Sequence, residues 1–190
     1  SDETKPLSQR LVHAADIAMY HAKRRGRNCC FWYEPSMESE LRYRRQLEAG
    51  IRRGIEAGEF IPYYEQQIDL GSGKLTGFEM LARWNSPAFG IVNPQVFIPI
   101  AEEHGLIGDL GNLILAKACR DVSQWQDLRL SVNVSPVQLN NRAFTRTIER
   151  IVKLNRFALH RLEVEFTETA LIKNTERAAD PDPRRARMDS

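Results

Sequence analysis

Three separated segments of this chain alternate apolar and polar residues with the period of two that is typical of a half-buried β-strand. They are residues 75–84, 128–134 and 162–168. Each segment has one apolar face, and the opposite faces carry polar side chains that include Glu79, Arg83, Asn133 and Glu165. If these faces line one interior, two carboxylates and an amide meet there, beside an arginine that can hold a phosphate. Such oxygen ligands suit a hard divalent cation such as Mg²⁺ or Mn²⁺.

Helical patterns alternate with these strands from residue 60 onward. A strand at 60–68 and a turn at 71–73 come first, and helical patterns cover residues 94–126 and 143–155. Strands that alternate with helices indicate parallel β/α architecture. Polar residues that face inward favour a barrel over an open sheet.

The first third of the chain also has a helical pattern. Apolar residues three to four apart predict a helix over residues 6–25, followed by a short strand at 29–33 (CCFWY) and a second helix over 36–58 with Ser36 as its cap. Further along, Asn93 before a proline predicts a helix start. Pro99 predicts that another short helix begins there, because proline breaks a helix interior.

The composition is that of an ordinary soluble globular protein, with 42% hydrophobic and 27% charged residues and a net charge of +2 over 190 residues. So small a net charge creates no field that recruits nucleic acid or an anionic membrane. A basic cluster at residues 23–27 falls at a predicted helix end, where cations suit the helix dipole. We therefore predict neither a nucleic-acid partner nor membrane contact within this segment.

The cysteines and the termini bear on location. Cys29, Cys30 and Cys119 are odd in number and lack CxxC spacing, which argues against a disulfide framework and a zinc site. No signal peptide opens the chain, and no apolar run approaches the roughly 20 residues of a membrane-spanning helix. A cytoplasmic location is predicted, with any membrane anchor upstream of this segment.

Four motifs stand in order between residues 60 and 174. They are EMLAR (79–83), PQVFIPIAEEHGLI (94–107), VNVSPVQL (132–139) and EFTETALI (165–172). Together they resemble the EAL domain of cyclic di-GMP phosphodiesterases, which writes EALLR or EVLAR where this chain has EMLAR. Four motifs in order make accidental similarity improbable.

The resemblance implies a chemistry and a set of site residues. In such enzymes two metal ions, Mg²⁺ or Mn²⁺, activate a water for in-line attack on one phosphodiester of cyclic di-GMP, which gives the linear dinucleotide. By motif match, Glu79, Asn133 and Glu165 are metal ligands, and Arg83 contacts a phosphate of cyclic di-GMP. Where the family usually has YQP, this chain has YEQ at residues 64–66, which puts Glu65 at the second position. An inward carboxylate there faces the substrate phosphate and repels it unless a cation intervenes.

The resemblance also divides the chain. Residues 1–35 resemble the C-terminal end of a GGDEF domain through ADIAMYHAKRRGRN, although the GGDEF motif is absent and no cyclase activity is expected. Residues 36–58 form a linker helix, and residues 59–179 form the N-terminal half of an EAL domain. Residues 180–190 (DPDPRRARMDS) have no periodic apolar positions and are predicted to be a disordered tail outside the family pattern.

The predicted fold is therefore α/β, an incomplete TIM-type barrel of about the first half, since a whole barrel takes about 250 residues.

The family's DDFGTGYSSL-type segment is missing, as are the lysine, glutamate and glutamine that complete its site, so no complete catalytic set is expected. We predict an inactive fragment of a cyclic di-GMP phosphodiesterase. The alternative is a degenerate EAL module that acts as a cyclic di-GMP receptor or a protein-docking domain. An exposed strand edge invites pairing, which predicts a homodimer or higher oligomer.

Two structural roles compete with metal binding. Glu79 can pair with Arg83 in a salt bridge that has no catalytic meaning. Asn133 can cap the helix that follows VSP.

Overall fold

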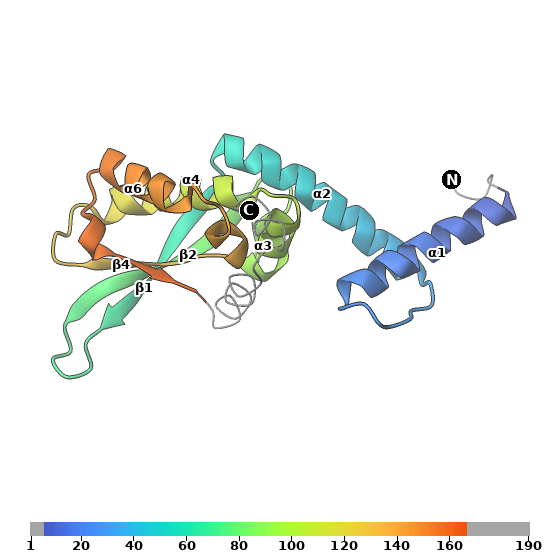
Figure 1. Cartoon of the computed structure of the whole chain (residues 1–190), viewed down its shortest axis with the longest axis horizontal. Coiled ribbons are helices and arrows are strands. Elements are labelled where there is room, and N and C mark those ends of the chain that lie inside the picture. The colour runs from blue at the N-terminus through green and yellow to red at the C-terminus, as the bar shows by residue number, and fades with distance from the viewer. Residues whose placement is uncertain (1–5, 167–190) are drawn as a thin grey trace, which may run out of the picture. The chain divides into compact units, whose positions relative to one another are not determined.

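The computed structural model describes residues 6–166. The chain divides into two compact units, Ser1–Ala49 and Gly50–Ser190. The predicted tail at 180–190, and the part of the third polar segment beyond residue 166, lie outside the described residues. Figure 1 labels the helices and strands along the chain. Among the residues described, no helix has both the length and the apolar character needed to cross a membrane.

The first unit contains α1 (Leu7–Arg24) and the beginning of α2 (Pro35–Ala57). Both predicted helices are confirmed to within a residue or two. Ile17 and Ala18 are the buried residues of α1. The helix is tied to α2 by an ion pair between Arg24 and Glu40, whose charged atoms lie 3.3 Å apart. The predicted cap is wrong: α2 begins at Pro35, where a proline fits because the first helical N–H needs no partner, and Ser36 lies inside the first turn.

The predicted strand at residues 29–33 is also wrong. The segment has no regular secondary structure, and Trp32 is 93% exposed. Its residues have high β-propensity, but that propensity reflects packing on a sheet, and a strand exists only where another strand accepts its backbone hydrogen bonds. The described residues offer this segment no such strand.

The second unit is built on a five-stranded sheet with the order β1-β2-β4-β5, in which β3 pairs with β2. The strands are β1 (Phe60–Ile68), β2 (Leu75–Ser86), β3 (Gly90–Val92), β4 (Arg129–Asn133) and β5 (Leu162–Glu165). Strands β2, β4 and β5 are parallel. Over the described residues the sheet is open, so the incomplete barrel predicted from the sequence is confirmed in type.

The parallel architecture predicted from the sequence does not extend to β1, which runs antiparallel to β2. The loop between them spans only residues 69–74, whereas a parallel crossover needs a dozen or more residues. In this loop the Asp69 carboxylate accepts hydrogen bonds from the Ser72 hydroxyl at 2.6 Å and from the Ser72 amide at 2.8 Å. These bonds lower the pKa of Asp69, because they favour its charged form.

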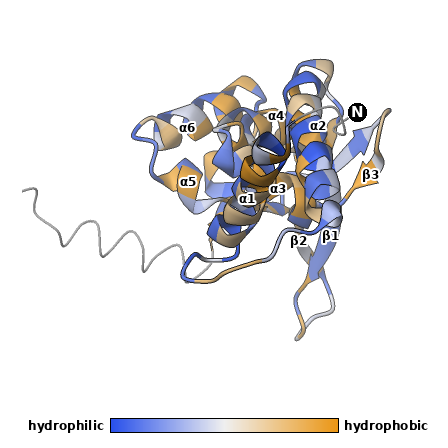
Figure 2. Ribbon diagram, turned by 90° about the vertical axis from the view of Figure 1, so that its right-hand side faces the viewer, coloured by the Kyte–Doolittle hydropathy of each residue, from blue (hydrophilic) through white to orange (hydrophobic). Residues whose placement is uncertain are grey.

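Four helices accompany the sheet: α3 (Pro94–Glu103), α4 (Ile107–Val122), α5 (Pro136–Leu139) and α6 (Phe144–Leu154). Figure 1 shows α4 and α6 together on one face of the sheet. The helices combine hydrophobic and hydrophilic positions, as amphipathic helices do (Figure 2).

The start of α3 agrees with the sequence, because the Asn93 side chain accepts a hydrogen bond from the Gln95 amide. The helix break predicted at Pro99 is wrong, since Pro99 lies inside one continuous helix. Proline has no N–H, so the carbonyl of Gln95, four residues before Pro99, lacks its usual helical donor. The neighbouring Phe97 and Ile100 are fully buried, and their burial stabilises the helix against that loss.

Aromatic side chains form the centre of the core. The ring of Phe60 stacks on Trp84 with a centroid distance of 5.2 Å and meets Phe97 edge-on at 5.4 Å. The indole nitrogen of Trp84 donates to Glu59 at 2.8 Å, so its polar atom is satisfied. These contacts join β1, β2 and α3.

Tyr64 and Cys119 link β1 to α4. The Tyr64 hydroxyl donates to the Asp121 carboxylate at 2.6 Å. Burial, followed by this hydrogen bond, raises the pKa of Tyr64 above its usual range. Burial also raises the pKa of the Cys119 thiol to about 11. Cys119 therefore acts as a small apolar residue of the core.

Arg161 joins the end of α4 to the start of β5. It is 7% exposed, and its guanidinium donates to the carbonyls of Leu128, at 2.7 Å, and Val122, at 3.3 Å. It also donates to the carbonyl of Trp125 and lies 4.4 Å from the centre of the Phe157 ring. The buried guanidinium of Arg161 thus donates to three carbonyls, one at the end of α4 and two in the loop that follows α4.

We expect Arg161→Ala to lower the free energy of unfolding by about 3 kcal/mol, because it removes the charge-assisted hydrogen bonds from a buried guanidinium to the carbonyls of Leu128, Val122 and Trp125. The exposed neighbour His160→Ala is the matched control, and it should change stability by less than about 0.5 kcal/mol. Urea titration followed by circular dichroism measures both. Equal stabilities for the two variants would contradict the role assigned to Arg161.

Candidate functional site

Strand register places the polar residues on one face of the sheet. Side chains of the opposite parity meet the helical side of the sheet. Between ring centroids, Trp84 lies 6.1 Å from Phe97 of α3, and Phe78 lies 5.7 Å from Trp125 in the loop after α4. Because side chains alternate along a strand, Glu79 and Arg83 belong to the other face. The alternation predicted from the sequence therefore holds in β2.

The same face carries Asn133 and Glu165 on neighbouring strands. Asn133 of β4 stands beside Glu165 of β5 in the parallel register. The Asn133 side-chain amide donates to the Glu79 carboxylate at 2.7 Å. The amide of Val134 donates to the Glu165 carbonyl at 2.8 Å, which fixes the two strand ends together. The structure thus joins Glu79 directly to Asn133 and puts Glu165 on the adjacent strand.

The competing structural roles are absent from the described part of the chain. No ion pair there links Glu79 to Arg83. The Arg83 guanidinium instead donates to the Ala82 carbonyl at 2.8 Å and lies 5.4 Å from the centre of the Tyr63 ring. The helix after VSP is capped by Ser135, whose side chain accepts from the Val137 amide.

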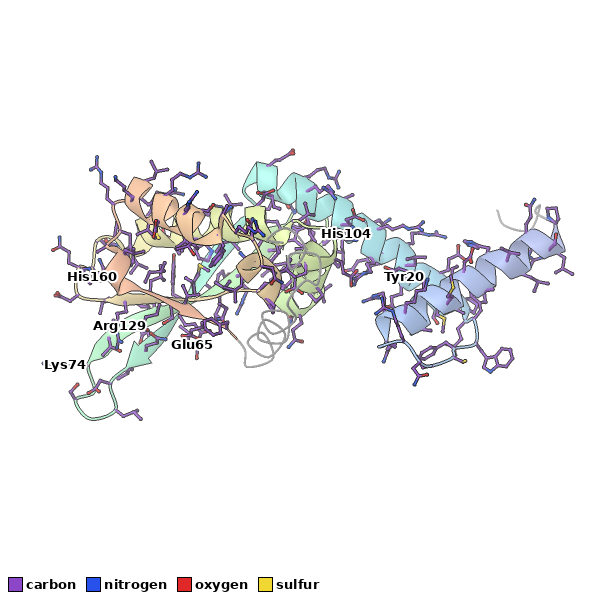
Figure 3. All side chains as sticks on the ribbon, viewed as in Figure 1. Tyr20, Glu65, Lys74, His104, Arg129 and His160 are labelled. Atoms are coloured by element: carbon purple, nitrogen blue, oxygen red, sulfur yellow. The ribbon has the colours of Figure 1, made fainter. Side chains whose placement is uncertain are left out.

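Glu65 adds a third carboxylate to this face. It stands directly opposite Glu79 in the antiparallel register of β1 and β2, and it is exposed. Like charges in directly opposed positions repel. The side chain is labelled in Figure 3. The register therefore puts Glu65 on the face that carries Glu79, and its effect on a substrate phosphate stays a prediction.

The chemistry of these side chains fits a divalent cation. Glu79 and Glu165 form no ion pair within residues 6–166, so their negative charges are not neutralised there. No group of three or more His, Cys, Asp or Glu side chains in that range has the geometry to hold a metal. The hard oxygen donors that this face offers are the carboxylates of Glu79 and Glu165 and the amide oxygen of Asn133.

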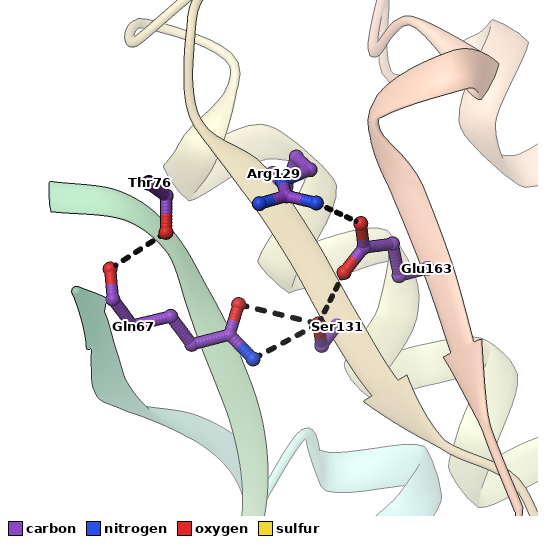
Figure 4. Close-up of polar contacts among 5 residues, drawn as sticks. All are labelled: Gln67, Thr76, Arg129, Ser131 and Glu163. Carbon is purple, nitrogen blue, oxygen red and sulfur yellow. Dashed lines mark hydrogen bonds and ion pairs between the residues drawn. The ribbon is translucent and has the colours of Figure 1, made fainter. Parts of the chain in front are cut away.

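A second polar row crosses the same face nearer the other end of the strands (Figure 4). The Gln67 side-chain amide donates to the Ser131 hydroxyl at 3.1 Å, and that hydroxyl lies 3.2 Å from the Glu163 carboxylate, to which it can donate. Glu163 also pairs with Arg129 at 2.6 Å. Alternation within residues 128–134 and 162–168 places Ser131, Glu163 and Arg129 on the polar faces, whereas nothing in the run at 60–68 singled out Gln67.

Gly77 lets Gln67 reach across β2. Gln67 and Gly77 are cross-strand partners, and Ser131 lies one strand further on. A Cβ atom on Gly77 would lie 2.8 Å from the Arg129 carbonyl oxygen and 3.0 Å from the Gln67 side-chain oxygen. The missing side chain therefore opens the path of the hydrogen bond between β1 and β4. A glycine inside an alternating strand was the available signal.

A family model for the EAL domain matches residues 48–187. The chain belongs to the EAL domain family. Its curated relatives include an uncharacterized signaling protein of Caulobacter vibrioides, 39% identical over 91% of this chain and 22% of that protein. The cyclic di-GMP phosphodiesterase PdeR of Escherichia coli is 33% identical over 90% of this chain and 26% of its own length. This EAL chain thus spans about a quarter of these relatives' length.

Solved EAL structures share the fold. The phosphodiesterase PaMucR in complex with c-di-GMP matches with a TM-score of 0.65 and 26% identity, over 70% of this chain and 56% of that chain. The EAL domain of FimX from Pseudomonas aeruginosa, bound to c-di-GMP, matches with a TM-score of 0.63 at 19% identity, over 70% and 54% of the two chains. The second likeness supports the fold alone.

We expect Gly77→Ala in this EAL chain to reduce stability by about 1–3 kcal/mol, because the new methyl group meets a backbone carbonyl that cannot move aside cheaply. Gly108→Ala in α4 is the matched control. A Cβ there meets nothing within 4 Å, so alanine should stabilise the helix by up to about 1 kcal/mol. Urea unfolding of both variants checks the opposite signs, and a stabilising Gly77→Ala would refute the packing described.

Proposed function

We propose that this chain forms the first part of a cyclic di-GMP phosphodiesterase site of the EAL type. Glu79, Asn133 and Glu165 bind Mg²⁺ or Mn²⁺, and Arg83 binds a phosphate of cyclic di-GMP. The observation that carries the proposal is the 2.7 Å contact between Asn133 and Glu79, with Glu165 in register beside Asn133. Relatives that include a cyclic di-GMP phosphodiesterase support it.

The three ligands supply oxygen atoms from neighbouring strands. The Asn133 amide can turn its oxygen toward a cation, because its two ends have the same shape. A bound divalent cation would activate water and neutralise charge at the phosphodiester. The two carboxylates hold the positive charge at the open face, and Glu65 adds negative charge beside them. Without a cation, this charge repels a phosphate.

The contacts of Arg83 support a role in binding a phosphate. Its guanidinium is held by the Ala82 carbonyl and by the Tyr63 ring, so less freedom is lost when a ligand binds. Tyr63 is 49% exposed and remains accessible beside it. A guanidinium can contact a phosphate through two parallel N–H groups, which fixes the orientation of the substrate.

We further propose that the 190-residue chain by itself binds these ligands but does not hydrolyse cyclic di-GMP. Its sequence contains no DDFGTGYSSL-type segment, which completes the site in the family it resembles. The remaining assignments belong to the same proposal: a GGDEF remnant at residues 1–35, a linker at 36–58, and a cytoplasmic location. A receptor role for cyclic di-GMP is the alternative.

Incubation with Mn²⁺ and cyclic di-GMP tests the proposal. We expect the chain to bind Mn²⁺ in calorimetric titration, Glu79→Gln to weaken that binding at least about tenfold, and no linear dinucleotide to form. Glu163→Gln is the matched control, because its partners are Arg129 and Ser131 in the other polar row. No Mn²⁺ binding would refute the metal site. Turnover abolished by Glu79→Gln would refute inactivity, and tight cyclic di-GMP binding without turnover or metal dependence would support the receptor role.

We also propose that the chain self-associates through its open sheet. Strands β1 and β5 lie at the two edges and pair on one side only within the described residues, and unpaired edges favour contact with another copy. A stable dimer should bury more than about 1,000 Å². Light scattering at micromolar concentration is expected to give twice the chain mass of 21.8 kDa. A monomer under these conditions would exclude the dimer.

A further inference from the structure

Ser135, two residues after Asn133, is the junction of a hydrogen-bond network. Its hydroxyl donates to the Glu102 carboxylate at 2.5 Å and accepts from the Val137 amide at 3.1 Å. Its own backbone amide donates to the side-chain oxygen of Gln138 at 3.1 Å. The loop between β4 and α5 is therefore held by one side chain from outside the loop, Glu102, as well as by its own capping box.

The bond to Glu102 is the strong member of this network. A hydroxyl that donates to an ionised carboxylate at this distance makes a charge-assisted hydrogen bond, which is roughly twice as strong as a neutral one. Glu102 lies on α3, next to Ala101 and near Ile100, both of which are fully buried. The Glu102 carboxylate is thus held in place by a packed helix, and its hydrogen bond to Ser135 fixes the loop relative to α3.

A second anchor acts on the same turn from α4. A Cβ atom on Gly111 would clash with the side-chain nitrogen of Gln138, so the Gln138 side chain occupies the space that a larger residue would fill. Because Gln138 accepts from the Ser135 amide, α4 limits where Ser135 can lie. The loop is consequently braced by two helices that belong to the core of the second unit.

A single residue, Val134, separates Ser135 from Asn133. Val134 donates its amide to the Glu165 carbonyl, so the segment from Asn133 to Ser135 is held at β5 and at α3. Its first residue, Asn133, contacts Glu79. We propose that Glu102 is a positioning residue of the metal site: through Ser135 it holds Asn133 where its side chain contacts Glu79, in register beside Glu165. This inference rests on the proposed function.

The size of the effect follows from the role. Groups that orient a metal ligand from behind typically change metal affinity by about 10- to 100-fold when they are removed. We expect Glu102→Gln to weaken Mn²⁺ binding within this range, since the neutral amide no longer makes a charge-assisted bond. Ser135→Ala removes the other end of the same bond and should have a similar effect. The double variant should then be little weaker than either single one, because both remove one interaction.

Glu103→Gln is the matched control for charge. It removes the same negative charge one residue further along α3, at an exposed position. If the loss of affinity in Glu102→Gln came from charge alone, the control would reproduce much of it. We expect Glu103→Gln to bind Mn²⁺ within about twofold of the original chain, since exposed charges at a distance are screened.

The experiment measures Mn²⁺ affinity by electron paramagnetic resonance on the full chain and its variants, with urea unfolding as a check of folding. A loss of about tenfold or more in Glu102→Gln and Ser135→Ala, without additivity, supports the inference. Unchanged affinity in a folded Glu102→Gln overturns it and leaves the metal site intact.

A second measurement separates the inference from the proposed function. If the original chain binds no Mn²⁺, the metal site itself is refuted. The orienting role of Glu102 is then judged by the Asn133 side-chain amide signals in the metal-free protein, assigned by comparison with Asn133→Ala. Shifted or broadened signals in Glu102→Gln support the coupling, and signals at their original positions overturn it.

Discussion

The structure depends on one constraint, which is the alternation of side chains in three parallel strands that share a register. In β2 and β4 one parity is apolar and packs on helices, as Trp84 and Leu130 do, both fully buried. The other parity is thereby turned to the opposite face, where Glu79, Asn133 and Glu165 gather. Burial of the apolar face supplies the stability, and the polar face can remain open and charged because it does not contribute to the core.

The charged face is organised by contacts between strands. Asn133 donates to Glu79 from one strand to the next, and Gln67 crosses a glycine to reach Ser131. The two rows differ in charge balance. In the row shown in Figure 4, Glu163 is neutralised by Arg129, whereas Glu79 and Glu165 have no cationic partner in residues 6–166. This difference separates a row whose charges are paired within the sheet from one whose carboxylates have no cationic partner in that range.

Much of this arrangement could be predicted from the sequence. The predictions failed where a segment's structure depends on which other segment packs against it. Helix boundaries in the first unit and the polar faces of the strands agree with the prediction, because both depend on local periodicity. The strand expected around Trp32 does not form, since β-propensity alone cannot supply a neighbouring strand. Pro99 continues a helix that was expected to break, because buried neighbours hold the turn around it.

The sequence by itself determined which residues share a face and to which family their motifs belong, since the alternation of a strand and the spacing of a motif are properties of short segments. Only the tertiary structure decided that β1 runs antiparallel to β2, that Glu65 stands opposite Glu79, and that the loop after Asn133 is held by Glu102. These features depend on strand register and helix packing. Strand register and helix packing are determined jointly by residues that lie far apart in the chain. No single segment of the sequence therefore carries enough information to predict these features.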